Sequence, residues 1–154
     1  MSVLAAMSVA AVLAWWPLVL TMTIRDRADG RIVFRARMSE GEEFILSFIH
    51  SVNRRPVHDT IRVNAEELVI VLSRYDSMGA GMPESFTMEN GWMIHRVGRS
   101  VPEVGLFIGR VANHTIELRG RRLPMDKMAR PGTAVVIRPE KASYYQVWSE
   151  GGFK

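Results

Sequence analysis

Short runs of strand-forming residues, each ended by a turn signal, fill the chain after residue 24. The alternation is clearest in residues 43–50 and 56–63, where apolar side chains recur on one face of an extended backbone. The apolar positions of these two runs are Phe44, Leu46, Phe48, Val57, Ile61 and Val63. Further strands are predicted at residues 31–38, 68–72, 86–89, 92–97, 104–111, 115–119 and 133–138. No amphipathic helix of convincing length accompanies them. The pattern therefore predicts an all-β fold, an antiparallel β-sandwich or barrel of about eight strands.

Three of these runs carry more specific expectations. The unbroken apolar run at residues 68–72 suits a strand covered on both sides. The pair Asn90-Gly91 favours the positive φ angles of a two-residue hairpin turn. Residues 104–111 and 115–119 are expected to form another hairpin around Asn113.

The pattern before residue 25 differs completely, because residues 1–24 contain no charged side chain. A helix over residues 3–22 would span about 30 Å, the thickness of the hydrocarbon core of a bilayer. Trp15 and Trp16 suit a membrane interface, and Pro17 would kink or end the helix. A transmembrane anchor is therefore expected, with a buried soluble helix as the alternative.

This division predicts three parts: an anchor at residues 1–24, a β-domain at residues 25–140 and a C-terminal tail at residues 141–154. In the tail, the aromatic side chains could dock on the domain or form a contact surface for a partner; they are Tyr144, Tyr145 and Trp148. On the positive-inside rule alone, Arg25, Arg27 and Arg31 favour a cytoplasmic β-domain.

Composition excludes several functions. The chain has no cysteine, which excludes a disulfide framework, a thiolate nucleophile and a Cys-ligated zinc. A sequence pI near 10 suggests nucleic-acid binding, but the net charge is only +4 and the basic residues are scattered. No partner among nucleic acids is therefore expected.

The chemistry-bearing residues form no recognised catalytic or metal-binding motif. The four histidines, at positions 50, 58, 95 and 114, make no HxH or HExxH pair. His58 and Asp59 are neighbours, so in a strand they point to opposite faces. His50 beside Ser51 suggests a nucleophile only superficially, because a triad depends on geometry. Neither a metal nor a cofactor nor a catalytic residue is expected.

Two loops are the candidate contact surface for a ligand or a partner. The first follows the run at residues 43–50, and the second follows the run at residues 68–72. In the second loop glycines allow positive φ or close approach of the backbone, and a proline fixes the exit. The candidate residues are His50, Ser51, Arg55, Tyr75, Ser77, Gly79, Gly81 and Pro83. Two purely structural connections are the alternative reading.

The same loops resemble the signatures of a bacterial family, the domain of unknown function number eighteen-fifty. The matching residues are Phe48, His50, Ser51, Val52, Pro56 and Val57, then Tyr75, Ser77, Gly79, Ala80, Gly81 and Pro83. Members are small membrane-anchored proteins, often encoded beside TAXI-type TRAP transporters, which use a periplasmic solute-binding protein. The resemblance implies a β-domain on the outer side of the cytoplasmic membrane, periplasmic or extracellular, opposite to the side that the arginines favour.

Three hypotheses about function follow. The first is a non-enzymatic, single-pass accessory protein of the cell envelope, with a TRAP transporter membrane subunit or solute receptor as its partner. The second is an envelope small-ligand or metal-binding β-domain, acting as a sensor or chaperone, with a pocket lined by His50, Tyr75 and His95. The third is a hydrolase, which rests on His50 and Ser51 alone.

Overall fold

The computed structural model of the protein describes residues 15–79, 81, 83 and 85–149. Within these residues, eleven strands form two antiparallel sheets. The four-stranded sheet has the order β2 (Ile32–Arg37), β1 (Val19–Asp26), β11 (Ala134–Ala142) and β8 (Val104–Phe107). The seven-stranded sheet has the order β10 (Arg121–Pro124), β9 (Thr115–Leu118), β3 (Glu42–Ile49), β4 (Pro56–Val63), β5 (Leu68–Tyr75), β7 (Trp92–Val101) and β6 (Thr87–Glu89). A 3₁₀ helix, η1 (Met125–Lys127), follows β10, and α2 (Tyr144–Ser149) follows β11. The all-β prediction is confirmed.

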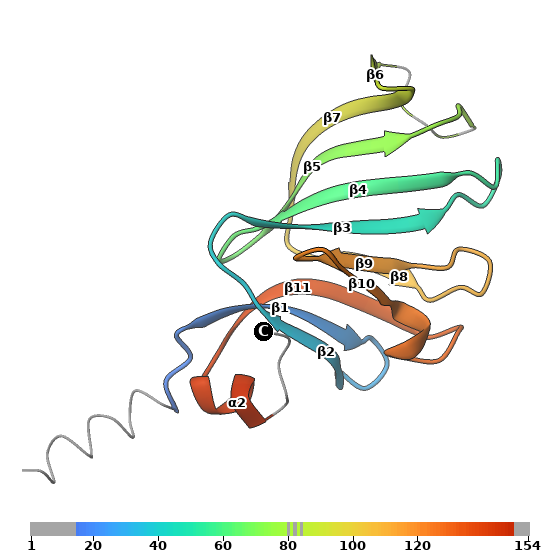
Figure 1. The fold of residues 1–154 in the computed structure, drawn as a ribbon. Coiled ribbons are helices and arrows are strands. Elements are labelled where there is room, and N and C mark those ends of the chain that lie inside the picture. The colour runs from blue at the N-terminus through green and yellow to red at the C-terminus, as the bar shows by residue number, and fades with distance from the viewer. Residues whose placement is uncertain (1–14, 80, 82, 84, 150–154) are drawn as a thin grey trace, which may run out of the picture.

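The two sheets face each other over only part of their area. The four-stranded sheet lies against the β3 and β9 part of the larger sheet, whereas β5, β7 and β6 extend away from it (Figure 1). The buried core follows this arrangement: it includes Met22 and Ile24 of β1, and Phe44 and Leu46 of β3. From β5 it includes Leu68 at the first position of the strand. The rest of the larger sheet therefore has an inner face that the second sheet does not cover.

Several predicted elements are confirmed closely. The run at residues 43–50 is β3, and the run at residues 56–63 is β4. Asn90 and Gly91 have φ angles of 52° and 82°, as a primed two-residue turn requires. They connect β6 to β7, in which Glu89 pairs with Trp92.

The expectation of one helix over residues 3–22 is wrong at its C-terminal end. Residues 19–26 are strand β1, in the middle of the four-stranded sheet. After Pro17 the sequence alternates threonine with large apolar residues, which is the period of a strand, and Met22 and Ile24 point into the core. The β-domain therefore begins before residue 25. Residues 3–14 lie outside the described residues, and among the described ones no helix is long and apolar enough to cross a membrane.

The hairpin predicted around Asn113 does not form. β8 ends at Phe107 and pairs with β11, whereas β9 pairs with β3 and β10 in the other sheet. Ile108 continues toward β11 through hydrogen bonds with the backbone of Thr133 and Gly132. Since apolar side chains of both strands enter one core, their alternation alone does not reveal that they belong to different sheets.

The expectation that residues 68–72 are covered on both sides is also wrong. Only Leu68 of this run is buried, and the next four residues are half-buried. The pairing of β5 with both neighbours shifts at Val71. The strand lies in the part of the sheet that extends beyond the second sheet, so neither of its faces is fully covered (Figure 1).

The C-terminal tail also begins later than predicted, since β11 continues to Ala142. The rest of the tail, as far as the structure describes it, is the short helix α2. Its N-cap, Ser143, and Gln146 exchange two hydrogen bonds of 2.9 and 3.1 Å between side chain and backbone. The helix lies below the four-stranded sheet, near the start of β1 (Figure 1).

Candidate functional site

A cavity of about 510 Å³ opens at the end of the seven-stranded sheet where β3 and β5 finish and β4 begins. We call it the His50 cavity. Its lining residues are Phe48, Ile49, His50, Ser51, Val57, Asp59, Ser73, Tyr75, Gly81, Pro83, Ala112 and His114. They come from three neighbouring strands and from three loops. The cavity thus occupies the inner face of the sheet near the limit of the covered core.

The most unusual group in the cavity wall is the carboxyl group of Asp59. This residue stands between Val57 and Ile61 on the inward face of β4, opposite Ser73 of β5. Ser73 Oγ donates a hydrogen bond of 2.6 Å to Asp59 Oδ1. Burial raises the pKa of Asp59, and the hydrogen bond from Ser73 only partly opposes this effect. Within the described part of the chain, no basic side chain forms an ion pair with Asp59.

Two imidazoles from different loops face the same cavity. His114 precedes β9 and lies against the ring of Phe48, with 5.8 Å between the ring centroids. Burial lowers the pKa of His114, so the ring is neutral at neutral pH. Its Nδ1 atom is buried and has no hydrogen-bond partner among the described residues. His50 Nδ1 accepts a hydrogen bond of 3.3 Å from the backbone N–H of Val52, which fixes the orientation of the ring.

Tyr75 closes the cavity toward the second loop. Its side chain is completely buried, and its hydroxyl donates a hydrogen bond of 3.2 Å to the carbonyl oxygen of Pro83. The ring of Phe86 meets that of Tyr75 edge to face at 6.3 Å. Burial raises the pKa of the Tyr75 hydroxyl, which therefore remains protonated. The tyrosine thus contributes a ring surface and a fixed loop to the cavity.

The two loops that the sequence singled out are joined directly. The guanidinium of Arg55 forms a bidentate ion pair with the carboxylate of Asp76. Asn53 Nδ2 donates a hydrogen bond of 3.2 Å to the carbonyl oxygen of Ser77. Gly79 lies so close to Asn53 that a Cβ atom would stand 2.7 Å from Nδ2. These contacts hold the mouth of the cavity together.

The structure therefore divides the predicted site residues into two groups. The first lines the cavity and comprises His50, Ser51, Tyr75, Gly81 and Pro83. The second joins or shapes the loops outside it and comprises Arg55, Ser77 and Gly79.

His95, the third histidine expected in the pocket, lies elsewhere. Its Nδ1 atom is hydrogen-bonded at 2.7 Å to the carbonyl oxygen of Ser85, and it does not line the cavity. His58 lies on the opposite face of β4 from Asp59, as the alternation predicts. It shares a hydrogen bond of 2.8 Å with Ser47 and meets the ring of Trp92. Burial, followed by the positive charge of Arg74, lowers the pKa of His58.

Sequence reasoning missed Asp59, Ser73 and His114 as site residues. A usable signal exists for Asp59, because a carboxylate in the apolar register of a strand is an exception that calls for a role. Ser73 similarly ends the apolar run of β5. No comparable signal marks His114, since only the tertiary structure brings its loop to β3.

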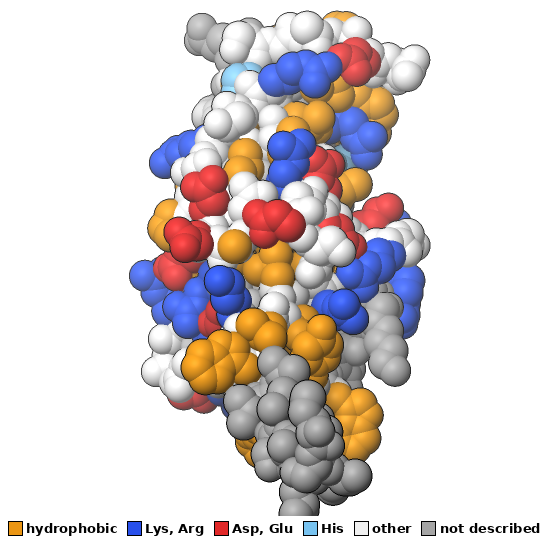
Figure 2. All heavy atoms as spheres, turned by 90° about the vertical axis from the view of Figure 1, so that its left-hand side faces the viewer, with side chains coloured by type: hydrophobic (Ala, Val, Ile, Leu, Met, Phe, Trp, Pro, Cys, Tyr) orange, Lys and Arg blue, Asp and Glu red, His pale blue; other side chains and the backbone are white. Residues whose placement is uncertain are grey.

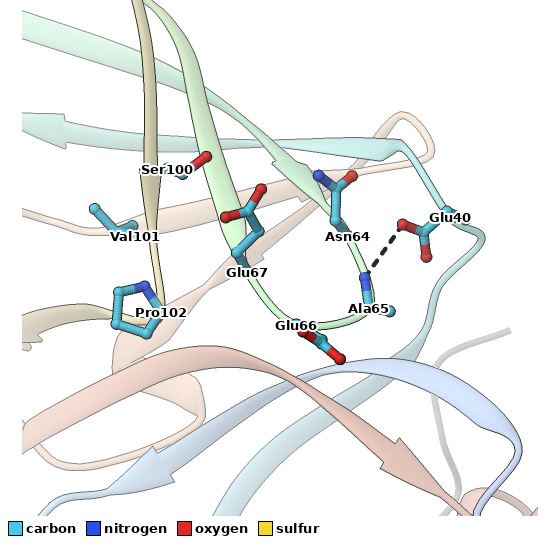
Figure 3. A pocket seen from close by; sticks show the side chains of 8 residues that line it. All are labelled: Glu40, Asn64, Ala65, Glu66, Glu67, Ser100, Val101 and Pro102. Atoms are coloured by element: carbon cyan, nitrogen blue, oxygen red, sulfur yellow. Dashed lines mark hydrogen bonds between the residues drawn. The ribbon is translucent and has the colours of Figure 1, made fainter.

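A second hollow, of about 470 Å³, lies at the other end of the same sheet. Figure 3 shows its three glutamates, Glu40, Glu66 and Glu67, pointing in different directions. Glu40 accepts a hydrogen bond from the backbone N–H of Ala65 (Figure 3). In the described part of the chain, no three His, Asp or Glu side chains come together as metal ligands. The His50 cavity is therefore the better candidate site.

The fold and the cavity define a small antiparallel β-domain with a partly polar pocket beside its core. The family model described as "Domain of unknown function (DUF1850)" matches residues 44–125, more than half of the chain. The chain belongs to this family. The matched segment contains both loops and the whole lining of the His50 cavity. No curated protein and no solved structure matches the chain.

Proposed function

We propose that this chain is a non-enzymatic binding domain whose His50 cavity takes a small organic ligand. The observation that carries the proposal is the half-buried carboxyl group of Asp59 in the cavity wall, with Ser73 as its hydrogen-bond donor. Burial disfavours the charged form of this carboxyl group, and acids with a raised pKa in clefts mark candidate sites. A ligand that supplied a hydrogen-bond donor would compensate for this burial.

The remaining lining indicates the kind of ligand. Phe48 and Val57 offer apolar surface beside Asp59, and the buried ring of Tyr75 packs behind this wall. An ammonium or hydroxyl group facing the carboxylate, on an apolar body, would match both parts of the wall. His50 and His114 could then bind polar atoms at the other side of the ligand.

A ligand screen with matched variants tests this proposal. The full-length protein is titrated with a panel of primary amines, alcohols and carboxylic acids, and binding is followed by thermal shift and by NMR. Amines or alcohols should stabilise the wild type and lose this effect in Asp59→Asn, whereas the surface variant Glu66→Gln should behave as wild type. Equal responses of Asp59→Asn and wild type would show that the cavity is not the binding site.

A second candidate is the role of a membrane-anchored accessory protein of the cell envelope, associated with a TAXI-type TRAP transporter. Support comes from the charge-free residues 1–24 and from the family resemblance. On this proposal the single-pass anchor lies in the cytoplasmic membrane, with the β-domain on its periplasmic or extracellular side. The joined loops around Arg55 and Asp76 would then contact the membrane subunit or the solute receptor.

The test of this role is genetic and biochemical. Deletion of the gene should abolish TRAP-dependent solute uptake, and the tagged full-length protein should co-purify with transporter subunits from gently solubilised membranes. Normal uptake together with normal assembly of the transporter in the deletion strain would contradict it.

A further inference from the structure

Large apolar side chains gather at one end of the molecule. We call this end the aromatic end and define it by six side chains that are 45% to 75% exposed: Trp15, Trp16, Leu18, Tyr144, Tyr145 and Trp148. The first three precede β1, and the last three belong to α2. Figure 2 shows hydrophobic side chains gathered at the lower end of the molecule. Solvent-exposed tryptophans in such a number mark an interaction surface.

Specific contacts hold the two parts of this surface together. The rings of Trp15 and Tyr145 stack at a centroid distance of 4.6 Å and an interplanar angle of 20°. The first residue of β1, Val19, pairs with the last residue of β11, Ala142, which directly precedes the capped start of α2. The aromatic end is therefore a fixed feature of the fold, because the sheet register places its two segments side by side.

The helix α2 itself contributes little to the core. None of its six residues is buried. A helix of this length is marginal in water, and packing of an apolar face normally stabilises such a helix. In α2 the most apolar side chain, Trp148, is also the most exposed, at 75%. The helix thus presents its aromatic side chains outward.

Basic side chains surround this apolar surface. Exposed Lys141 pairs in register with Leu20, and exposed Arg37 pairs with Thr21, both near the start of β1. Lys and Arg side chains lie on both sides of the apolar end in Figure 2. Basic side chains beside exposed aromatic ones are complementary to an anionic bilayer surface.

We propose that the aromatic end is a docking surface for the interfacial region of a phospholipid bilayer that contains anionic lipid. Tryptophan and tyrosine prefer this region because their rings are apolar and their N–H and O–H groups bind water and headgroups. The fourteen residues before Trp15 carry no charge, which favours lipid over an aqueous protein partner as the occupant. Docking would orient the domain, because the ends of β3 and β5, which line the His50 cavity, lie on the side of the molecule away from α2 (Figure 1). The inference rests on the membrane-associated role proposed above and does not depend on a ligand in the cavity.

Lipid quenching of a single tryptophan tests the surface directly. The full-length protein is reconstituted into vesicles of phosphatidylcholine and phosphatidylglycerol, with bromine atoms near the headgroups of a fraction of the lipids. The emission of Trp148 is obtained as the difference between wild type and Trp148→Phe. We expect brominated lipid to remove most of this emission. We expect weaker quenching in an Arg37→Gln/Lys141→Gln variant. Quenching should be normal in the control variant Phe107→Ser. This substitution removes a 70% exposed phenylalanine that pairs with Ala134, at the end of β11 away from the aromatic end.

The outcomes separate this surface from the membrane role. If the protein floats with the vesicles but Trp148 is not quenched, the docking surface is overturned and the membrane-associated role remains. If the protein does not float at all, both fail. If Tyr144→Ser/Trp148→Ser converts a dimer into a monomer in detergent, a second copy of the chain covers the aromatic end, and lipid docking is overturned.

Discussion

Two partly buried carboxylates, one on each sheet, are held in opposite ways. Glu140 of β11 accepts hydrogen bonds from Arg25 and Arg138, at distances from 2.6 to 2.8 Å. Burial alone would raise the pKa of Glu140, but the bonds and charges of these arginines outweigh it and lower the pKa. Asp59 of β4 has only Ser73 as a hydrogen-bond donor in the described structure, and its pKa is raised.

The surroundings of Glu140 stabilise the folded protein, whereas those of Asp59 do not. The arginines around Glu140 join β1 and β11, the central strands of the four-stranded sheet. Asp59 lies on the strand that passes from the covered core to the His50 cavity, with Ile61 and Val63 on the core side. One end of β4 therefore packs in the core, and its other end forms part of the polar wall of the His50 cavity. Sites that bind ligands commonly retain such unfavourable groups.

The largest expected effect concerns the covered core. Phe44→Ala removes a ring that is 1% exposed, and we expect the free energy of unfolding to fall by about 3–5 kcal/mol, measured by chemical denaturation. Val57→Ala, on the wall of the cavity, should cost much less, since fewer atoms are removed. Met88→Ala, at a 60% exposed position, serves as the control. An equal loss in Phe44→Ala and Val57→Ala would contradict the division into a packed and a less packed region.

The next effect concerns the paired carboxylate. Glu140→Gln should lower the free energy of unfolding at pH 7 by about 1–2 kcal/mol, a range that allows for solvent screening. Because the folded pKa of Glu140 lies below the ordinary value of 4.5, its contribution is present above that value and is lost as pH falls through the folded pKa. Urea denaturation from pH 7 to pH 3 should show the wild type and the variant converging. Glu66→Gln should show no such convergence.

The unpaired carboxylate should respond with the opposite sign. Asp59→Asn keeps an acceptor for Ser73 but removes the charge, and we expect the variant to be more stable than the wild type at pH 7. The folded pKa of Asp59 lies above the ordinary value of 3.8, so stability from this group is complete below that value and is lost as pH rises through the folded pKa. The advantage of the variant should therefore disappear in acid. A variant that is less stable than the wild type at pH 7 would contradict the view that the charge of Asp59 destabilises the folded protein.

The smallest effect concerns the joined loops. Gly79→Ala should displace the amide of Asn53 and weaken its hydrogen bond to Ser77, at a cost of about 0.5–1 kcal/mol. In an Asn53→Ala background the same change should have almost no effect, because the displaced group is absent. Thermal unfolding of the four proteins in this double-mutant cycle measures the coupling. Additive effects of the two substitutions would mean that the contact between the loops contributes nothing.

The alternation of apolar side chains was sufficient to predict β3 and β4, and Asn90-Gly91 was sufficient to predict the turn between β6 and β7. The alternation of apolar side chains did not predict the pairing of β8 and β9, because these strands have similar patterns but belong to different sheets. It also failed at β1, where the absence of charge suggested a helix although threonine alternates with apolar residues from Leu20 to Ile24. In both cases the local pattern is compatible with two structures, and long-range pairing selects one.

For the candidate site, the two loops could be predicted from the sequence, because their turn residues and polar side chains reflect local preferences. Only the tertiary structure decided that Arg55 would join them to each other and that Asp59, Ser73 and His114 would share a cavity with His50. The reason is physical: a loop conformation depends on a few neighbouring residues, whereas a cavity depends on which strands pair and where the second sheet stops covering the first. In the four-stranded sheet, the register of β1 with β11 likewise places Trp15 against Tyr145.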